Sequence, residues 1–171
     1  APDFDSLPGA GVLVNVNGYG GGDIVEGTVF GQPASGIRPA QGYPGLDAFT
    51  FVDQNDAELY PPVAGSDGAV LDAAPLSASE VNTLLSSALA VANRARAQIR
   101  TPLGTPARVT VAVVDSQGNI LGMLRSRDAP VFGADVSLQK ARTAALFSSP
   151  DAAVFLNNII EPTKYRNADT S

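Results

Sequence analysis

The chain has 171 residues, enough for one domain or one domain with an appendage, and too few for two full-sized cores. It contains neither cysteine nor histidine. This excludes disulfides, thiolate or imidazole metal sites, a cysteine nucleophile and a Ser-His-Asp triad. A net charge of −6 without a long basic stripe argues against nucleic acid as a partner. No apolar run approaches the roughly 18 residues of a membrane span.

The two parts of the chain differ in charge and in glycine and proline content. Residues 1–75 carry ten acidic residues and one basic residue, and they hold 21 of the 30 glycines and prolines. Residues 76–171 carry ten basic and seven acidic residues. We therefore predict an acidic, Gly/Pro-rich wrapping arm with short strands over 1–75, and a more regular unit over 76–171.

The chain begins at Ala1, and its single methionine is Met123. We therefore expect that an initiator or a longer leader was removed, either with a secretory signal or by internal proteolysis. We expect a periplasmic or secreted location.

Short strands and turns are predicted within the arm. Apolar residues on both sides of the glycines at 18–22 indicate a β-hairpin, and the alternation at 48–52 indicates a strand. The glycines lack the Gly-Lys-Ser/Thr ending of a phosphate loop. The acidic segment 53–58 offers oxygen ligands for calcium, but it lacks the glycine and terminal glutamate of an EF-hand, so a turn is favoured.

A long amphipathic helix is predicted after residue 76. Ser77 and Glu80 form a capping box, and apolar residues then recur at helical spacing from Val81 to Ile99. Pro102 and Gly104 are expected to end this helix. Arginines at 94, 96 and 100 crowd its last turns, where cations favour the helix dipole. We favour that role over an anion site.

A β-hairpin and two further helices follow. Residues 109–114 and 120–125 are strands around a short turn, and helices are predicted over 134–147 and 149–160. A lone hairpin is marginal in water, and residues 109–114 are too apolar for the edge of a sheet. Further strands must therefore come from the arm, from another copy or from a different chain.

Several segments in order resemble the GlcG/HbpS-like family of haem-binding proteins, over about residues 76–155. They are the strand and turn at 111–121, the segment 125–129 and the helical run 140–145, with the arm segment 36–47 as in longer secreted members. The resemblance implies an α/β (α+β sandwich) fold, an antiparallel sheet of about five strands with helices packed on it, and oligomeric assembly. It also implies a glycine-rich continuation carrying further strands, which is missing here. We therefore expect a proteolytically processed heterodimer, in which a second polypeptide supplies part of the sheet and the resulting unit forms a homo-oligomer.

The resemblance also implies a haem or tetrapyrrole ligand, yet histidine, the commonest haem ligand, is absent. Axial candidates are Met123, for which a core role is favoured, the four tyrosines and the hydroxyl of Thr143, for which packing is favoured. The arginine guanidinium binds a carboxylate through two parallel hydrogen bonds. The predicted ligand-binding residues are accordingly Arg125, Arg127, Asp128, Lys140, Arg142 and Thr143. Capping and solvation of the second helix is the alternative role for the charges among them.

Two functions follow from these residues. The first is a haem, tetrapyrrole or related small-ligand-binding protein outside the cytoplasm. The alternative is one subunit of a two-chain enzyme whose arginines hold a small carboxylate-bearing or hydroxylated substrate at the chain interface. A third hypothesis is a protein that serves only as a structural partner. No acid–base pair is evident, so no catalytic residue is assigned and enzymatic activity stays open. No metal site is predicted.

Overall fold

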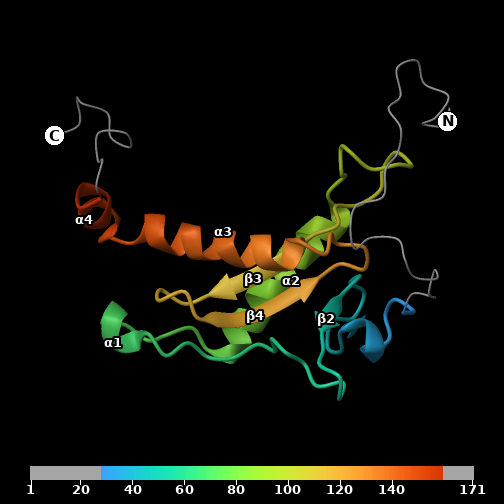
Figure 1. The fold of residues 1–171 in the computed structure, drawn as a ribbon, viewed down its shortest axis with the longest axis horizontal. Coiled ribbons are helices and arrows are strands. Elements are labelled where there is room, and N and C mark those ends of the chain that lie inside the picture. Colours follow the sequence, from blue (N-terminus) through green and yellow to red (C-terminus); the bar gives the residue numbers. More distant parts are fainter. Residues whose placement is uncertain (1–27, 160–171) are drawn as a thin grey trace, which may run out of the picture.

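Four strands form one antiparallel sheet in the computed structural model, which describes residues 28–159 (Figure 1). The strand order is β1 (Ile37–Pro39), β2 (Phe49–Phe51), β4 (Ile120–Arg125) and β3 (Thr110–Val114). With helices packed against this sheet, the predicted α+β class is confirmed. The described residues hold four strands, where about five were expected.

The β3–β4 hairpin forms where its apolar runs predicted it. Thr110 lies opposite Arg125, and Val113 lies opposite Gly122. A register shift between Val113 and Val114 then places an extra residue in β4. The turn is closed by Asp115, whose backbone N–H donates to Asn119 O (3.0 Å) and whose carboxylate accepts the Asn119 N–H (2.8 Å).

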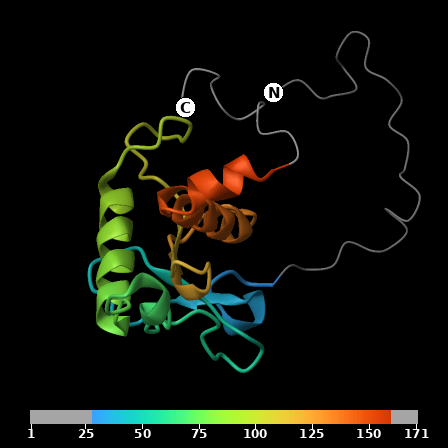
Figure 2. The same cartoon turned by 90° about the vertical axis from the view of Figure 1, so that its left-hand side faces the viewer.

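Helix α2 (Ala78–Arg94) covers one face of the sheet (Figure 2). The predicted capping box is present: Ser77 Oγ accepts the Glu80 N–H, and the Glu80 carboxylate accepts the Ser77 N–H. Its fully buried side chains pack with the strand residues of the same face, and together they make the core: Val81, Leu85, Leu89, Ala48, Leu121 and Leu124. At about 25 cal/mol per Å² of apolar surface, this burial is the main force that holds α2 on the sheet.

The helix ends earlier than its apolar spacing predicted. Ala95 is already extended, and its N–H makes the last helical bond, to Val91 O. The chain then runs beside residues 105–107, because Ala97 N donates to Thr105 O and Ala107 N donates to Ala95 O (2.9 and 2.8 Å). These pairings replace the helical bonds that would have carried the helix to residue 100.

Helix α3 (Gly133–Ser148) packs along β3, and α4 (Ala152–Asn157) follows it. Gly133 approaches Thr110, whose side chain points away from the face that α2 covers, so α2 and α3 lie on opposite sides of β3 (Figure 2). No side chain of α3 is buried. Helix α4 is shorter than predicted and begins after Asp151 rather than Ser149. None of the helices described is long and apolar enough to cross a membrane.

The arm supplies β1 and β2, which confirms the strand predicted at 48–52, and also a short 3₁₀ turn (Pro33–Ser35) and α1 (Gly68–Leu71). It then follows the free side of β4, where Met123 N donates to Tyr60 O and Val63 N donates to Leu121 O (3.1 and 2.8 Å). The acidic segment is the expected turn, closed by Asp53. The glycine-rich part of the hairpin predicted near residue 20 lies outside the described residues.

Candidate functional site

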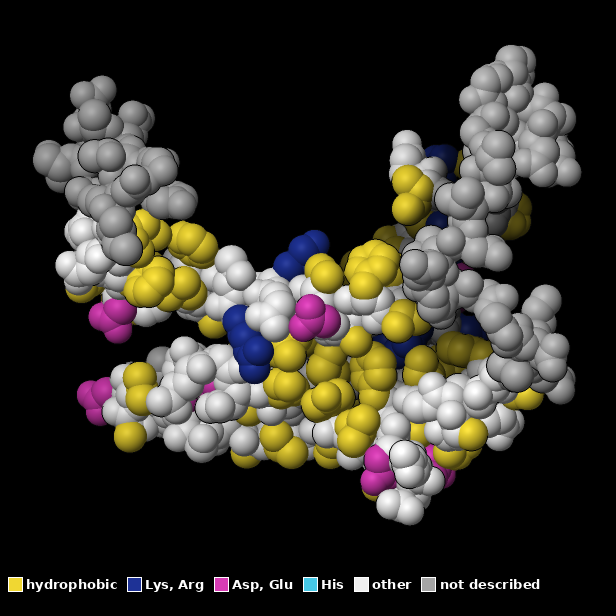
Figure 3. Space-filling view, viewed as in Figure 1, with side chains coloured by type: hydrophobic (Ala, Val, Ile, Leu, Met, Phe, Trp, Pro, Cys, Tyr) yellow, Lys and Arg dark blue, Asp and Glu magenta, His cyan; other side chains and the backbone are white. Residues whose placement is uncertain are grey.

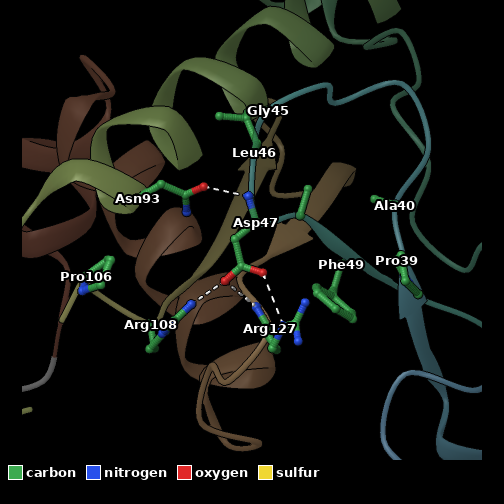
Figure 4. A pocket seen from close by; sticks show the side chains of 11 residues that line it. Pro39, Ala40, Gly45, Leu46, Asp47, Phe49, Asn93, Pro106, Arg108 and Arg127 are labelled. Atoms are coloured by element: carbon green, nitrogen blue, oxygen red, sulfur yellow. Dashed lines mark hydrogen bonds and ion pairs between the residues drawn. The ribbon is translucent and has the colours of Figure 1, made fainter. Parts of the chain in front are cut away.

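An open pocket of about 780 Å³ lies where the arm meets the C-terminal end of α2 (Figure 4). Its volume is within the range of roughly 300–1,000 Å³ that small-molecule sites occupy. The apolar residues of its lining are Pro39, Ala40, Leu46, Ala48, Phe49 and Pro106, and its polar side chains are Asp47, Asn93, Arg108 and Arg127. Polar atoms make up the larger part of its exposed surface. The pocket is thus a largely polar hollow with some apolar contacts along its walls.

Asp47 is the centre of the polar cluster (Figure 4). Its carboxylate accepts a hydrogen bond from Arg108 Nη1 and one from the backbone N–H of Arg127 (3.3 Å), while Arg127 Nε lies 3.7 Å away. The backbone N–H of Asp47 donates to Asn93 Oδ1 (2.7 Å). The arm, α2, the segment before β3 and the segment after β4 each contribute one of these residues.

The Arg127 guanidinium is the least committed charge of the pocket. Its side chain is 67% exposed, whereas those of Asp47 and Arg108 are 26% and 22% exposed. Its Cζ lies 5.4 Å from the ring centre of Phe49, a cation–π contact that holds the guanidinium over the pocket wall. Two guanidinium groups face one carboxylate, so the polar cluster carries an excess positive charge that suits a carboxylate ligand.

Of the residues predicted to bind ligand, only Arg127 lines this pocket. Arg125 is 2% exposed; its Nη2 donates to Ala129 O, and its guanidinium stacks on Phe51 at 5.5 Å. Burial lowers the pKa of Arg125, and the charge of Asp128 partly offsets this. Arg125 is therefore occupied by contacts within the protein.

The other predicted residues lie apart from the pocket. Asp128 forms an ion pair with Arg100 (2.8 Å). In α3, Lys140 faces solvent, whereas Arg142 lies against the turn of the β3–β4 hairpin, where its Nε donates to Gly118 O (2.9 Å). Thr143 donates its hydroxyl to Gln139 O, one turn earlier. A ligand-binding role for these four residues stays a prediction.

Asp47, Asn93 and Arg108 were not recognised from the sequence. Asn93 and Arg108 lie 46 and 61 positions after Asp47 in the sequence, and no sequence motif contains them together. The one available signal is that Asp47 directly precedes the strand predicted at 48–52. A charged residue just before an apolar strand is common, so this signal alone could not identify Asp47 as a site residue.

The pocket fits a carboxylate better than it fits a haem iron. No methionine, tyrosine or histidine lines it. Met123 is 4% exposed within β4, as expected for a core residue, and the hydroxyl of Tyr43 donates to Asn82. Over residues 28–159, no group of three or more acidic side chains is arranged to hold a metal ion.

Comparison with known families places the C-terminal half of the chain. Residues 84–169, slightly more than half of the chain, match a family model described as haem degrading protein HbpS-like. No curated protein and no solved structure matches the chain significantly.

Proposed function

The chain belongs to the HbpS-like family of haem-degrading proteins, and from this membership we propose that it binds a carboxylate-bearing small molecule, a tetrapyrrole or a related ligand, in the pocket around Asp47. The observation that carries this proposal is the exposed Arg127 guanidinium, stacked on Phe49 beside the Asp47–Arg108 pair. An incoming carboxylate accepts hydrogen bonds from Arg127, and the apolar residues of the lining, such as Leu46 and Pro106, contact part of the remaining ligand.

For a tetrapyrrole, this arrangement makes the propionates the recognised groups. The lining residues supply no axial ligand, so iron adds little to affinity at this site. A haem and the same macrocycle without its metal should therefore bind alike. Removal of the carboxylate charges should weaken both.

The test is a titration of the full chain with hemin, with metal-free protoporphyrin IX and with protoporphyrin dimethyl ester, followed by absorption and fluorescence. We expect similar Kd values for the two acids and a Kd at least about tenfold higher for the ester. Arg127→Ala should raise the Kd of both acids by about 10- to 100-fold, since hydrogen bonds between charged groups contribute about 1.5–3 kcal/mol.

Arg96→Ala is the matched control, because Arg96 is an exposed arginine of the same region outside the pocket lining. It should leave every Kd unchanged. Equal affinity for the ester, or unaltered binding by Arg127→Ala, would contradict the proposal. Much tighter binding of hemin than of protoporphyrin would instead indicate an axial ligand outside the pocket.

The second candidate is one subunit of a two-chain enzyme, in which the same arginines hold a small carboxylate-bearing or hydroxylated substrate. The observation that favours it is that the pocket is open, so that a second chain can add groups that the lining of this chain lacks. Activity should then require both chains and should fall on Arg127→Ala. Activity of the isolated chain would contradict this candidate.

We also propose a periplasmic or secreted location, proteolytic processing and assembly of the processed unit into a homo-oligomer. Family membership is the observation behind this proposal. Cell fractionation, intact mass and light scattering of the native material test it. A cytoplasmic, monomeric species with an unprocessed terminus would contradict it.

A further inference from the structure

The segment between α2 and β3 projects from the body of the molecule, beyond the C-terminal end of α2 (Figure 1 and Figure 2). Its stem is the pairing of residues 95–97 with residues 105–107. Its tip, residues 98–104, is closed by a hydrogen bond from the Thr105 N–H to Pro102 O (3.1 Å). We call residues 98–104 the tip loop; it is carried away from the core on a hydrogen-bonded stem.

Two apolar side chains of the tip loop are almost wholly exposed. Ile99 is 95% exposed and Leu103 is 79% exposed. A single exposed apolar residue is common on protein surfaces, but these two share one short tip that stands clear of the core. Transfer of both side chains out of water would release hydrophobic free energy that the fold itself leaves unused.

The tip loop lies in the most basic part of an acidic chain. Residues 81–114 hold four arginines and no acidic residue, whereas the whole chain has a net charge of −6. Two of these arginines form the ion pairs with Asp128 and Asp47. The other two, Arg94 and Arg96, are exposed, and neither has an acidic partner among residues 28–159. In Figure 3, hydrophobic and basic side chains appear on this projection, at the upper right beside the grey residues.

A narrow apolar tip flanked by arginines suits the surface of a lipid bilayer better than the surface of a protein. A stable protein interface buries roughly 800 Å² on each partner, from about 20–30 residues, which is far more than this tip offers. A membrane anchor needs only apolar side chains that enter the boundary of the acyl chains and cations level with anionic head groups. Because the chain as a whole is acidic, an anionic surface favours approach by this basic end.

We infer that the tip loop docks the protein on an anionic lipid surface, with Ile99 and Leu103 inserted at the boundary of the acyl chains and Arg94 and Arg96 at the phosphate head groups. The apolar side chains supply insertion, and the arginines supply attraction to the surface. With only two residues of each kind, the binding is peripheral and reversible.

The first test is co-sedimentation of the full chain with vesicles. One kind of vesicle is phosphatidylcholine alone, and the other contains about a third of phosphatidylglycerol. We expect at least about tenfold stronger partition into the anionic vesicles, because each arginine near an anionic surface contributes about fivefold. Raising the salt concentration to about 0.5 M should remove most of this difference, since salt screens exposed charges.

The double variant Ile99→Ser, Leu103→Ser tests insertion. It should lower partition into anionic vesicles at least about tenfold, because serine gains little on leaving water. Both positions are exposed, so the variant should fold, as circular dichroism would verify. Val70→Ser is the matched control: Val70 is a 64% exposed apolar residue of α1, far from the tip loop, and its substitution should leave partition unchanged (Figure 1).

The double variant Arg94→Gln, Arg96→Gln tests the charge. It should bring partition into anionic vesicles close to that into neutral vesicles, since the two exposed arginines supply the attraction. Unchanged preference for anionic vesicles in this variant would contradict the assigned role of the arginines.

Fluorescence gives a second measure of insertion. The chain has no tryptophan, so Ile99→Trp introduces a single reporter at the tip loop. Its emission should shift to the blue with anionic vesicles, because the indole leaves water. Val70→Trp, the control, should show no shift.

The inference would be overturned by equal partition into the two kinds of vesicle, by full binding of the folded serine double variant, or by unshifted emission of Ile99→Trp. Light scattering distinguishes the other occupant: a concentration-dependent dimer that is lost in the serine double variant would identify a second copy of the chain at the tip loop instead of lipid.

Discussion

At the residue scale, Asp67 ties the arm to the turn of the β3–β4 hairpin. It is 4% exposed, and its Oδ2 accepts the backbone N–H of Ser116 (2.8 Å). The hydrogen bonds from Ser116 hold the pKa of the Asp67 carboxyl below its usual range. Its contribution to folding is thus present above the pKa of the unfolded chain and is lost as the pH falls through the lower folded-state pKa.

We predict that Asp67→Asn lowers stability at neutral pH and flattens the acid side of the stability profile. Urea unfolding at a series of pH values below about 5 measures this. Hydrogen bonds from Ala57 and from Ser77 also lower the pKa values of Asp53 and Glu80, so part of the acid dependence remains in the variant. An acid limb identical to that of the parent would contradict the assignment.

Gly122 lies at a close approach between α2 and the sheet. A Cβ at this position would lie 2.9 Å from Leu85 Cδ1 and 3.4 Å from Pro62 Cα. Leu85 is fully buried in the core. We predict that Gly122→Ala costs about 1–3 kcal/mol in the free energy of unfolding, measured by urea denaturation.

A double-mutant cycle with Leu85→Ala checks the cause. Leu85→Ala alone should cost about 2–5 kcal/mol, because it leaves a cavity in the core. In the double variant, the added methyl occupies part of that cavity, so the combined loss should be smaller than the sum. Additive losses would show that Leu85 is not the group displaced by the new Cβ.

At the scale of elements, the start of α2 is fixed by residues that are close together in the sequence. The capping box at Ser77 is complete, and no distant residue takes part in it. We predict that Ser77→Ala costs about 0.5–2 kcal/mol in unfolding free energy, measured by thermal and urea denaturation followed by circular dichroism. Ser79→Ala, an exposed serine in the same turn, should change stability little. Equal effects of the two variants would rule out a capping role.

The end of α2 is a different case. Its amphipathic pattern continues to Ile99, but the helix stops at Arg94, because residues 95 and 97 bond to residues 105 and 107. Ile99 is consequently 95% exposed rather than part of the helical core face. A hydrophobic period predicts a helix only while no other segment competes for the same backbone groups.

At the scale of the whole molecule, Asp47 joins the arm to α2 and to both ends of the hairpin. We predict that Asp47→Ala costs about 1–3 kcal/mol, since Arg108 loses its partner in a partly buried site. Hydrogen exchange should accelerate in β1 and β2 and stay unchanged in β3. Gln41→Ala, an exposed arm residue, is the control. Uniform acceleration over the sheet would show that the arm and the body unfold together.

The sequence by itself determined the elements formed by neighbouring residues. The capping box and the Asp53 turn depend on contacts within a few positions, and the β3–β4 hairpin and the strand around Phe49 follow the apolar pattern of a single segment; all are present. The family, confirmed by the match over residues 84–169, also follows from the order of local segments.

Only the tertiary structure decided how these elements combine. The pocket joins Asp47 to residues 46, 61 and 80 positions away, and only Arg127 among them was expected in a site. The place of β1 and β2 beside β4, and of β3 at the end of the sheet, likewise has no local signature. Long loops must close before such contacts form, and the outcome depends on which surfaces compete for burial across the whole chain, not on the pattern within any one segment.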